Sequence, residues 1–185
     1  MLPDFESMTR VSLVDVFDGD VRRGIETHHR TDDAFHRGRV FLGLCSRALE
    51  VLSDASVRRG TARAVGHIAT EMFLDGLLAE RSEHVDDYLA ALEAVPPDAL
   101  RWEDSGRAFE TLQSRLMRWG APLDYRDPDF VLARLEAALR LRPRLAMTPE
   151  DVPRVARSLP ALEQQVRLYA EELLDELQDA LGFGR

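Results

Sequence analysis

The sequence of 185 residues predicts an all-α protein, a single-domain bundle of about seven or eight helices. Alternation of apolar and polar residues, the pattern of a half-buried strand, is nearly absent, and isoleucine occurs only at positions 25 and 68. Helical periodicity, in contrast, fills most of the chain between its proline and glycine residues. A chain of this length buries roughly 70% of its unfolded surface. We therefore expect residues 1–185 to form one domain.

The expected helices are separated by residues that start or stop helices. Pro96-Pro97 ends the fourth helix, because proline lacks an N–H group and disfavours helix at the preceding residue. Gly120 is a stop signal after the fifth. Asp127-Pro128 supplies the N-cap and first residue of the sixth, and Thr148-Pro149 opens a short seventh in the same way. The expected ranges are 20–36, 39–52, 56–81, 83–94, 106–119, 128 to about 143, a short helix from 148, and 159–181.

The composition excludes several classes of protein. All 24 basic residues are arginine, and without lysine the chain has no Walker A loop and no Schiff-base nucleophile. The net charge of −9 argues against a nucleic-acid-binding protein. The single cysteine, Cys45, excludes an internal disulfide and a thiolate zinc cluster, and its apolar surroundings predict a core position. With neither a bilayer-spanning segment nor a signal peptide, the expected location is cytoplasmic, without membrane contact.

The first expected helix carries a row of polar residues where its apolar face should be. At about 100° per residue, Val21, Ile25 and Phe35 share one face of the helix over 20–36. His28 and Asp32 fall within that face. His36 continues the row at its edge. Residues four apart stack on a helix, so His28, Asp32 and His36 form one line.

The third expected helix repeats this pattern. Its apolar residues are spread nearly all round it, which predicts a largely buried helix, yet His67, Glu71 and Asp75 again stand four apart. A buried carboxylate without a partner costs several kcal/mol. Helix bundles build metal sites from side chains at this spacing on facing helices. The two rows predict a cluster that contains His28, Asp32, His67 and Glu71. A metal-free hydrogen-bonded network of the same side chains is the alternative.

The order of several short motifs resembles the acyl carrier protein phosphodiesterase family. The resemblance rests on Pro3-Asp4-Phe5, on Gly24-Ile25-x2-His28-x3-Asp32, on a helix with two spaced acidic positions before Phe73-Leu74, on Tyr125-Arg126-Asp127-Pro128-Asp129-Phe130, and on Arg142-Pro143-Arg144-Leu145. It covers the chain from about residue 3 to about residue 180.

That resemblance implies an all-helical fold related to the HD phosphohydrolases. It implies a divalent metal, typically manganese, and hydrolysis of the phosphodiester that joins 4′-phosphopantetheine to acyl carrier protein, an activity of fatty acid metabolism. Asp4, His28 and Asp32 match the family's early Asp and its His and Asp. With the other polar residues of the two rows, the expected metal ligands are Asp4, His28, Asp32, His36, His67, Glu71 and Asp75.

The sequence also departs from the family's pattern. The family begins with an Asn-aromatic-Leu-Ala-His segment before its Gly-Asp-Phe, and this chain starts inside that second motif, so Met1 is a misassigned start or a ligand helix has been lost. The family's third helix reads Asp-x3-Asp-His, where this chain has His67-x3-Glu71-Met72. The ligand set is therefore changed, and Met72 cannot transfer protons.

The donor set defines the chemistry that we expect. Nitrogen and oxygen ligands suit Mn²⁺, Fe²⁺ or Mg²⁺, and Zn²⁺ fits as well. The cation would activate a water and polarise a phosphoryl oxygen. The expected catalytic residues are Asp32, Glu71 and Arg126. Glu71 would be a metal ligand or the general base, and Asp75 is the other candidate for the base. Arg126 would stabilise charge in the transition state. An acidic carrier protein would dock on Arg58, Arg59 and Arg63, or on Arg140, Arg142 and Arg144.

Two other functions remain open at this point. The first is a non-enzymatic helical protein whose His/carboxylate cluster is structural or has lost its activity. The second is a metal-dependent hydrolase of another phosphoester. The sequence does not predict the oligomeric state.

Overall fold

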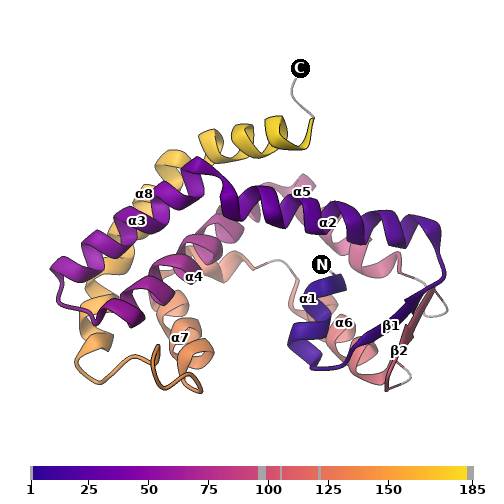
Figure 1. Cartoon of the computed structure of the whole chain (residues 1–185), viewed down its shortest axis with the longest axis horizontal. Helices are drawn as coiled ribbons and strands as arrows, with labels where there is room; N and C mark the ends of the chain where they lie inside the picture. Colours follow the sequence, from indigo (N-terminus) through magenta and orange to yellow (C-terminus); the bar gives the residue numbers. More distant parts are fainter. Residues whose placement is uncertain (1, 96–98, 105, 121, 183–185) are drawn as a thin grey trace. The chain divides into compact units, whose positions relative to one another are not determined.

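A computed structural model describes residues 2–95, 99–104, 106–120 and 122–182 (Figure 1). Within those ranges the chain forms eight α-helices, one 3-10 helix and a single two-stranded sheet, so the predicted all-α class is confirmed. The predicted break at Pro96-Pro97 lies outside the described residues. None of the described helices combines the length and apolarity that crossing a membrane requires.

The described chain forms two compact units, each built from two separate stretches of sequence. The first contains Met1–Asp33 and Arg81–Ala121, and the second contains Ala34–Glu80 and Pro122–Arg185. Helix α2 (Gly19–Arg37) contributes its first fifteen residues to the first unit and its last turn to the second. Each unit has its own apolar core.

The first unit combines α1 (Leu2–Thr9), α2, α5 (Ser82–Glu93) and α6 (Arg107–Trp119) with strands β1 (Leu13–Val16) and β2 (Leu100–Trp102). The strands pair antiparallel, with Leu13 opposite Trp102 and an irregularity before Asp15. Phe109 joins the sheet to α1, because its ring lies 5.3 Å from those of both Phe5 and Trp102. The sheet and α1 were not expected from the sequence, since strands of four and three residues are too short to show alternation.

The second unit is organised around α4 (Arg59–Leu78), which contacts α3 (Arg39–Asp54), the 3-10 helix η2 (Leu123–Arg126), α7 (Pro128–Leu139) and α8 (Asp151–Leu181). Helices α3 and α4 form a hairpin, and small residues bring them close together: a Cβ built on Gly66 would lie 3.0 Å from that of Ala48. The core is aliphatic and aromatic, with Phe41, Leu52, Phe73, Leu135 and Leu159 almost completely buried.

Most helix ends agree with the prediction. Asp127 is the N-cap of α7, where its side chain accepts a hydrogen bond from the Asp129 N–H, and Gly120 follows α6 with φ 73°. Helix α8 is a correction, because the two helices expected from 148 and from 159 are one continuous helix with Pro160 inside it. An interior proline costs about 3 kcal/mol. The buried Leu159, Leu162 and Val166 on either side of it hold the helix together through packing.

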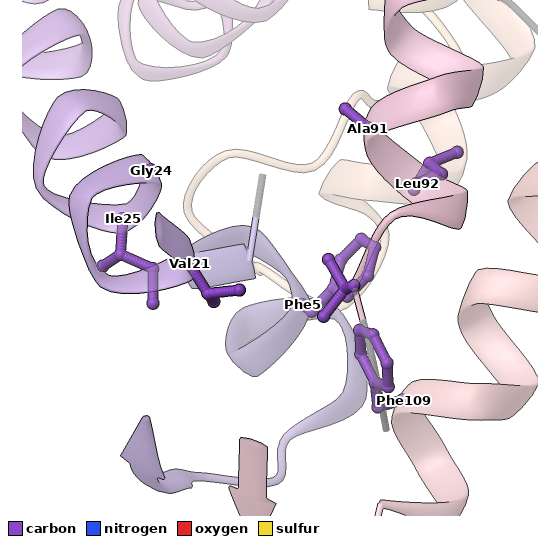
Figure 2. A pocket seen from close by; sticks show the side chains of 8 residues that line it. Phe5, Val21, Gly24, Ile25, Ala91, Leu92 and Phe109 are labelled. Atoms are coloured by element: carbon purple, nitrogen blue, oxygen red, sulfur yellow. The ribbon is translucent and has the colours of Figure 1, made fainter. Parts of the chain in front are cut away.

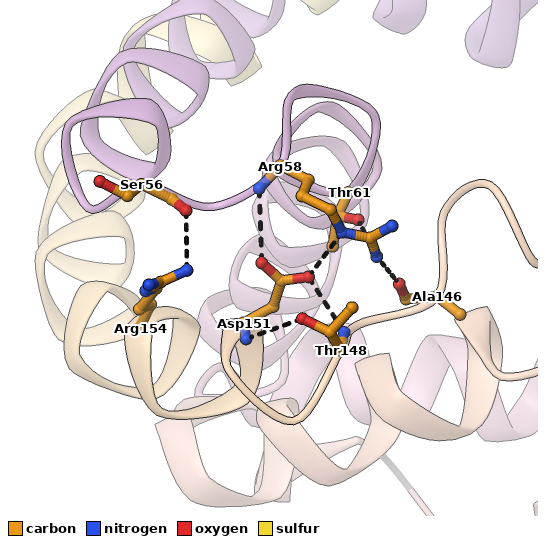
Figure 3. Close-up of polar contacts among 7 residues, drawn as sticks. All are labelled: Ser56, Arg58, Thr61, Ala146, Thr148, Asp151 and Arg154. Carbon is orange, nitrogen blue, oxygen red and sulfur yellow. Dashed lines mark hydrogen bonds and ion pairs between the residues drawn. The ribbon is translucent and has the colours of Figure 1, made fainter.

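A buried carboxylate fixes the start of α8 against the start of α4 (Figure 3). Asp151 accepts hydrogen bonds from Arg58 Nε at 3.0 Å and from the Thr148 N–H at 3.0 Å, and its own N–H donates to Thr148 Oγ1 at 3.2 Å. Arg58 also donates to Thr61 Oγ1 and to the Ala146 carbonyl. Arg58 is therefore a structural residue of this corner.

Candidate metal centre

Two histidines and a glutamate of the second unit converge on one point. His36 lies in the last turn of α2, and His67 and Glu71 lie one turn apart on α4. Each of the three offers a ligand atom, and these atoms all lie within 4.8 Å of one another. Glu71 Oε1 is 3.6 Å from His36 Nε2 and 3.3 Å from His67 Nε2. The structure thus brings together three of the seven predicted ligands.

Aromatic packing orients the two imidazoles. Their rings are stacked, with centroids 5.2 Å apart and planes 9° apart. The ring of Phe41, from α3, makes a T-shaped contact with each imidazole, and its centroid lies 5.2 Å from that of His36 and 5.3 Å from that of His67. Phe41 itself is buried in the core. The two imidazoles therefore pack on a residue of the core. The sequence analysis did not identify Phe41 as part of the site.

The corner between α2 and α3 determines where His36 lies. Helix α2 ends at Arg37, and α3 begins two residues later, at Arg39. Glu176 of α8 accepts hydrogen bonds from the N–H groups of Arg39 at 3.0 Å and Val40 at 2.8 Å. A carboxylate at this position satisfies the unpaired donors of a helix N-terminus and interacts favourably with its dipole. Glu176 thereby fixes α3, and with it the last turn of α2.

The centre is accessible to solvent. The side chains of His36 and Glu71 are each 34% exposed, and that of His67 is 46% exposed. Burial lowers the pKa of His67 and so favours the neutral imidazole, which is the form that binds metal. If the three side chains held a metal, this exposure would leave coordination positions for water or substrate, as catalytic metal sites require.

Cys45 of α3 lies beside this centre but is not one of its three converging residues. Burial and, to a smaller extent, the charge of Glu71 raise the pKa of its thiol, a hydrogen bond with Thr70 opposes them, and the resulting pKa is about 11. The thiol is therefore protonated at neutral pH, and Cys45 is a half-buried residue packed against the core.

Three other predicted ligands belong to the first unit. His28 Nε2 lies 3.7 Å from Asp4 Oδ1. Burial lowers the pKa of His28, and the charges of Asp4 and Asp32 oppose this change. Asp32 is exposed, and no described residue of α2 is fully buried. The expectation of an inward-facing position is therefore wrong for Asp32 and holds only in part for the half-buried His28, because the apolar stripe of α2 is only partly covered.

The remaining predicted residues lie outside the three-residue cluster. Asp75 is exposed one turn beyond Glu71 on α4. Arg126, in η2, has its Nη1 3.9 Å from Glu80 Oε1, and its Nε donates to the Leu123 carbonyl. The backbone of Arg126 lies beside Gly76, five residues after Glu71, since a Cβ built on Gly76 would be 2.9 Å from the Arg126 nitrogen, and its guanidinium is directed to Glu80.

No match is found when the chain is compared with protein-family models, with curated proteins or with solved structures.

Proposed function

We propose that this chain is a divalent-metal-dependent phosphodiester hydrolase whose metal is held by His36, His67 and Glu71. The observation that carries the proposal is the convergence of these three donors, all within 4.8 Å, on an accessible surface. Two neutral nitrogens and one carboxylate suit Mn²⁺, Fe²⁺ and Zn²⁺, whereas imidazole is a poor ligand for Mg²⁺. The resemblance in sequence favours Mn²⁺ among them.

The residues of the centre have separate roles in this mechanism. His36 and His67 would hold the cation through an imidazole nitrogen each, and Glu71 would neutralise part of its charge. A bound divalent metal lowers the pKa of a coordinated water and polarises a phosphoryl oxygen. Asp75 projects from the same row of α4, one turn from Glu71, where side chains lie about 5–6 Å apart at Cβ. With Glu71 used as a ligand, Asp75 is our candidate for the general base.

The substrate that we propose is the phosphodiester of a phosphopantetheine group on an acidic carrier protein. The two arginine groups considered for docking meet in one region. A Cβ on Gly60 would lie 3.1 Å from the Arg144 carbonyl oxygen, so the start of α4 adjoins the 140–146 segment. Arg58 is engaged with Asp151 there. The exposed members, which support binding of an acidic protein, are Arg59, Arg63, Arg140, Arg142 and Arg144.

The first test is metal binding, measured by calorimetry and by the melting temperature with and without MnCl₂ or ZnCl₂. A ligand that binds only the folded state raises the melting temperature. His67→Ala and Glu71→Gln should abolish that rise. His84→Ala, which changes a partly exposed histidine of α5 outside the cluster, should preserve it. If wild-type protein melts at the same temperature with and without metal, the cluster is a structural His/carboxylate network.

The second test is hydrolysis by the metal-loaded protein. Mass spectrometry of holo-carrier protein should show loss of the prosthetic group, and bis(p-nitrophenyl) phosphate reports a general phosphodiesterase. Asp75→Asn should lower the turnover number by about 10²–10⁴-fold while metal affinity is unchanged. Cleavage of the small ester alone would make the protein a hydrolase of another phosphoester. Cleavage of neither substrate would leave a metal-binding protein without this activity.

A further inference from the structure

The first unit contains an apolar cavity that is separate from the metal centre. Its volume is about 230 Å³, and it lies between α2 on one side and α1, α5 and α6 on the other (Figure 2). In Figure 2, Val21 and Ile25 lie on one side of it, and Phe5, Leu92 and Phe109 lie on the other. The residues that line it are Phe5, Val21, Gly24, Ile25, Ala91, Leu92, Val95 and Phe109.

This lining contains no charged or hydrogen-bonding side chain. Phe5, Leu92 and Phe109 form its buried floor, with exposed fractions of 2–4%. Gly24 is exposed and also lines the cavity, so the cavity opens to solvent beside Gly24. An apolar cavity retains water poorly and binds apolar molecules instead. The space is therefore suited to a ligand that buries hydrocarbon and keeps another end in water.

From this geometry we infer that the cavity binds the hydrocarbon end of a small neutral amphiphile, a chain of about eight or nine carbons. An engineered cavity of about 150 Å³ holds the six carbons of benzene, which by proportion gives about nine carbons here. The charge of the ligand follows from the residues near the opening. Asp4 adjoins Phe5, and its carboxylate lies 3.7 Å from His28, one helical turn beyond Gly24. An anionic head would be repelled by this carboxylate, and the cation beside Gly24, Arg23, is already paired with Asp20.

Position 24 offers a way to block the site. A Cβ built on Gly24 meets no atom within 4 Å, so a larger side chain has room at the opening. Gly24→Leu should therefore occlude the cavity without a clash. Gly43→Leu is the matched control, because Gly43 is also inside a helix, lies in the second unit, and would bring its Cβ no closer than 3.7 Å to the flexible end of Arg47.

The experiment measures binding of 1-butanol, 1-hexanol, 1-octanol and 1-decanol to the full chain by calorimetry. Each methylene buried should tighten binding about fourfold, until the cavity is full near eight or nine carbons. Octanoate should bind at least tenfold more weakly than 1-octanol. Gly24→Leu should weaken 1-octanol binding at least tenfold, and Gly43→Leu and His67→Ala should leave it unchanged.

Two results would overturn the inference. One is an affinity that does not depend on chain length. The other is a folded Gly24→Leu protein that binds 1-octanol as well as the wild type does, since the cavity would then be only a packing defect. Val21→Phe fills the same space from another position on α2, and it replaces Gly24→Leu in this comparison if that variant does not fold. The metal centre and the cavity are tested by different variants. If the metal proposal fails, the binding of 1-octanol and its loss in Gly24→Leu can still be interpreted.

Discussion

Asp151 is fully buried, at 0% exposure, and its environment favours the charged form. Burial alone would raise its pKa, but hydrogen bonds from Thr148 and Arg58 outweigh this effect and lower the pKa from 3.8 to about 2. A depressed pKa in the folded state means that folding is stabilised when the group is ionised. That stabilisation is complete above about pH 4 and is lost as the pH falls toward 2.

We therefore expect Asp151→Asn to reduce the free energy of unfolding by about 2 kcal/mol at pH 7, from the charge alone. Urea denaturation at pH 7, 4 and 3 should show the difference from wild type shrinking as the pH falls. The control is Asp179→Asn, at an exposed position near the end of α8, which should change stability by less than about 0.5 kcal/mol. A difference that stays constant with pH would contradict this account.

Cys45 gives a second prediction at the scale of one residue. Since its pKa is about 11, the thiolate that reacts with alkylating reagents is scarce near neutral pH. Iodoacetamide at pH 8 should modify the native protein about 100-fold more slowly than the urea-unfolded chain. The native rate should also rise about tenfold per pH unit up to pH 10. Because the sequence holds one cysteine, the mass change reports this residue alone. Equal native and unfolded rates would be inconsistent with a half-buried, protonated thiol.

Residue patterns identified the donor types but not which of them would meet. The i, i+4 spacing of His67 and Glu71 correctly placed them side by side, because spacing on one helix is fixed. The meeting of His36 with them depends on the corner at Gly38 and on Glu176, a residue 140 positions away, and no local pattern encodes that contact. For the same reason the sequence did not separate His28 and Asp32, in one unit, from His36 in the other.

At the scale of elements, replacing two helical glycines, Gly76 and Gly24, by alanine should change stability in opposite directions. A Cβ on Gly76 would lie 2.8 Å from the Tyr125 carbonyl carbon and 2.9 Å from the Arg126 nitrogen, so η2 must move away from α4. Gly24 has no such neighbour. Gly76→Ala should lose about 1–3 kcal/mol of stability through overpacking. Gly24→Ala should gain about 0.5–1 kcal/mol through helix propensity.

Chemical denaturation of the two variants in parallel checks this pair. Each substitution adds the same methyl group to the interior of a helix, so a shared effect on the unfolded chain cancels in the comparison. Equal stabilisation of both would show that η2 does not pack closely on α4.

Helix boundaries were predictable from the sequence wherever a capping residue or glycine marked them, as at Asp127 and Gly120. The prediction failed where packing outweighs local preference. Pro160 indicated a break, yet α8 continues through it because Leu159 and Leu162 are buried on both sides. The short strands β1 and β2 are stabilised by each other and by Phe109, which the sequence alone does not bring near them.

At the scale of the whole molecule, the two units predict separate responses to two ligands. The metal centre lies in the second unit, and the apolar cavity lies in the first. In hydrogen exchange, Mn²⁺ should slow amide exchange mainly within 34–80 and 122–182. With 1-octanol the slowing should fall mainly within 2–33 and 81–120. Ligand-stabilised regions exchange more slowly because their opening becomes less frequent.

Exchange measured on His67→Ala and Gly24→Leu provides the controls. Each variant should lose protection by one ligand and keep protection by the other. If either ligand protects both units equally, then the two units do not behave as separate cooperative blocks, and the division of the chain into two has no energetic meaning.

The first unit is built from two stretches of sequence that the ribosome synthesises at different times. Ala34–Glu80 separates α1, β1 and α2 from their partners α5, β2 and α6. At translation rates of about 5–20 residues per second, Phe109 is synthesised several seconds after Phe5. The α3–α4 hairpin needs no such delay, because its two helices are consecutive. On the nascent chain, the hairpin that carries His67 and Glu71 can form first, while the apolar residues of the N-terminal segment still await the strand and helices that will cover them.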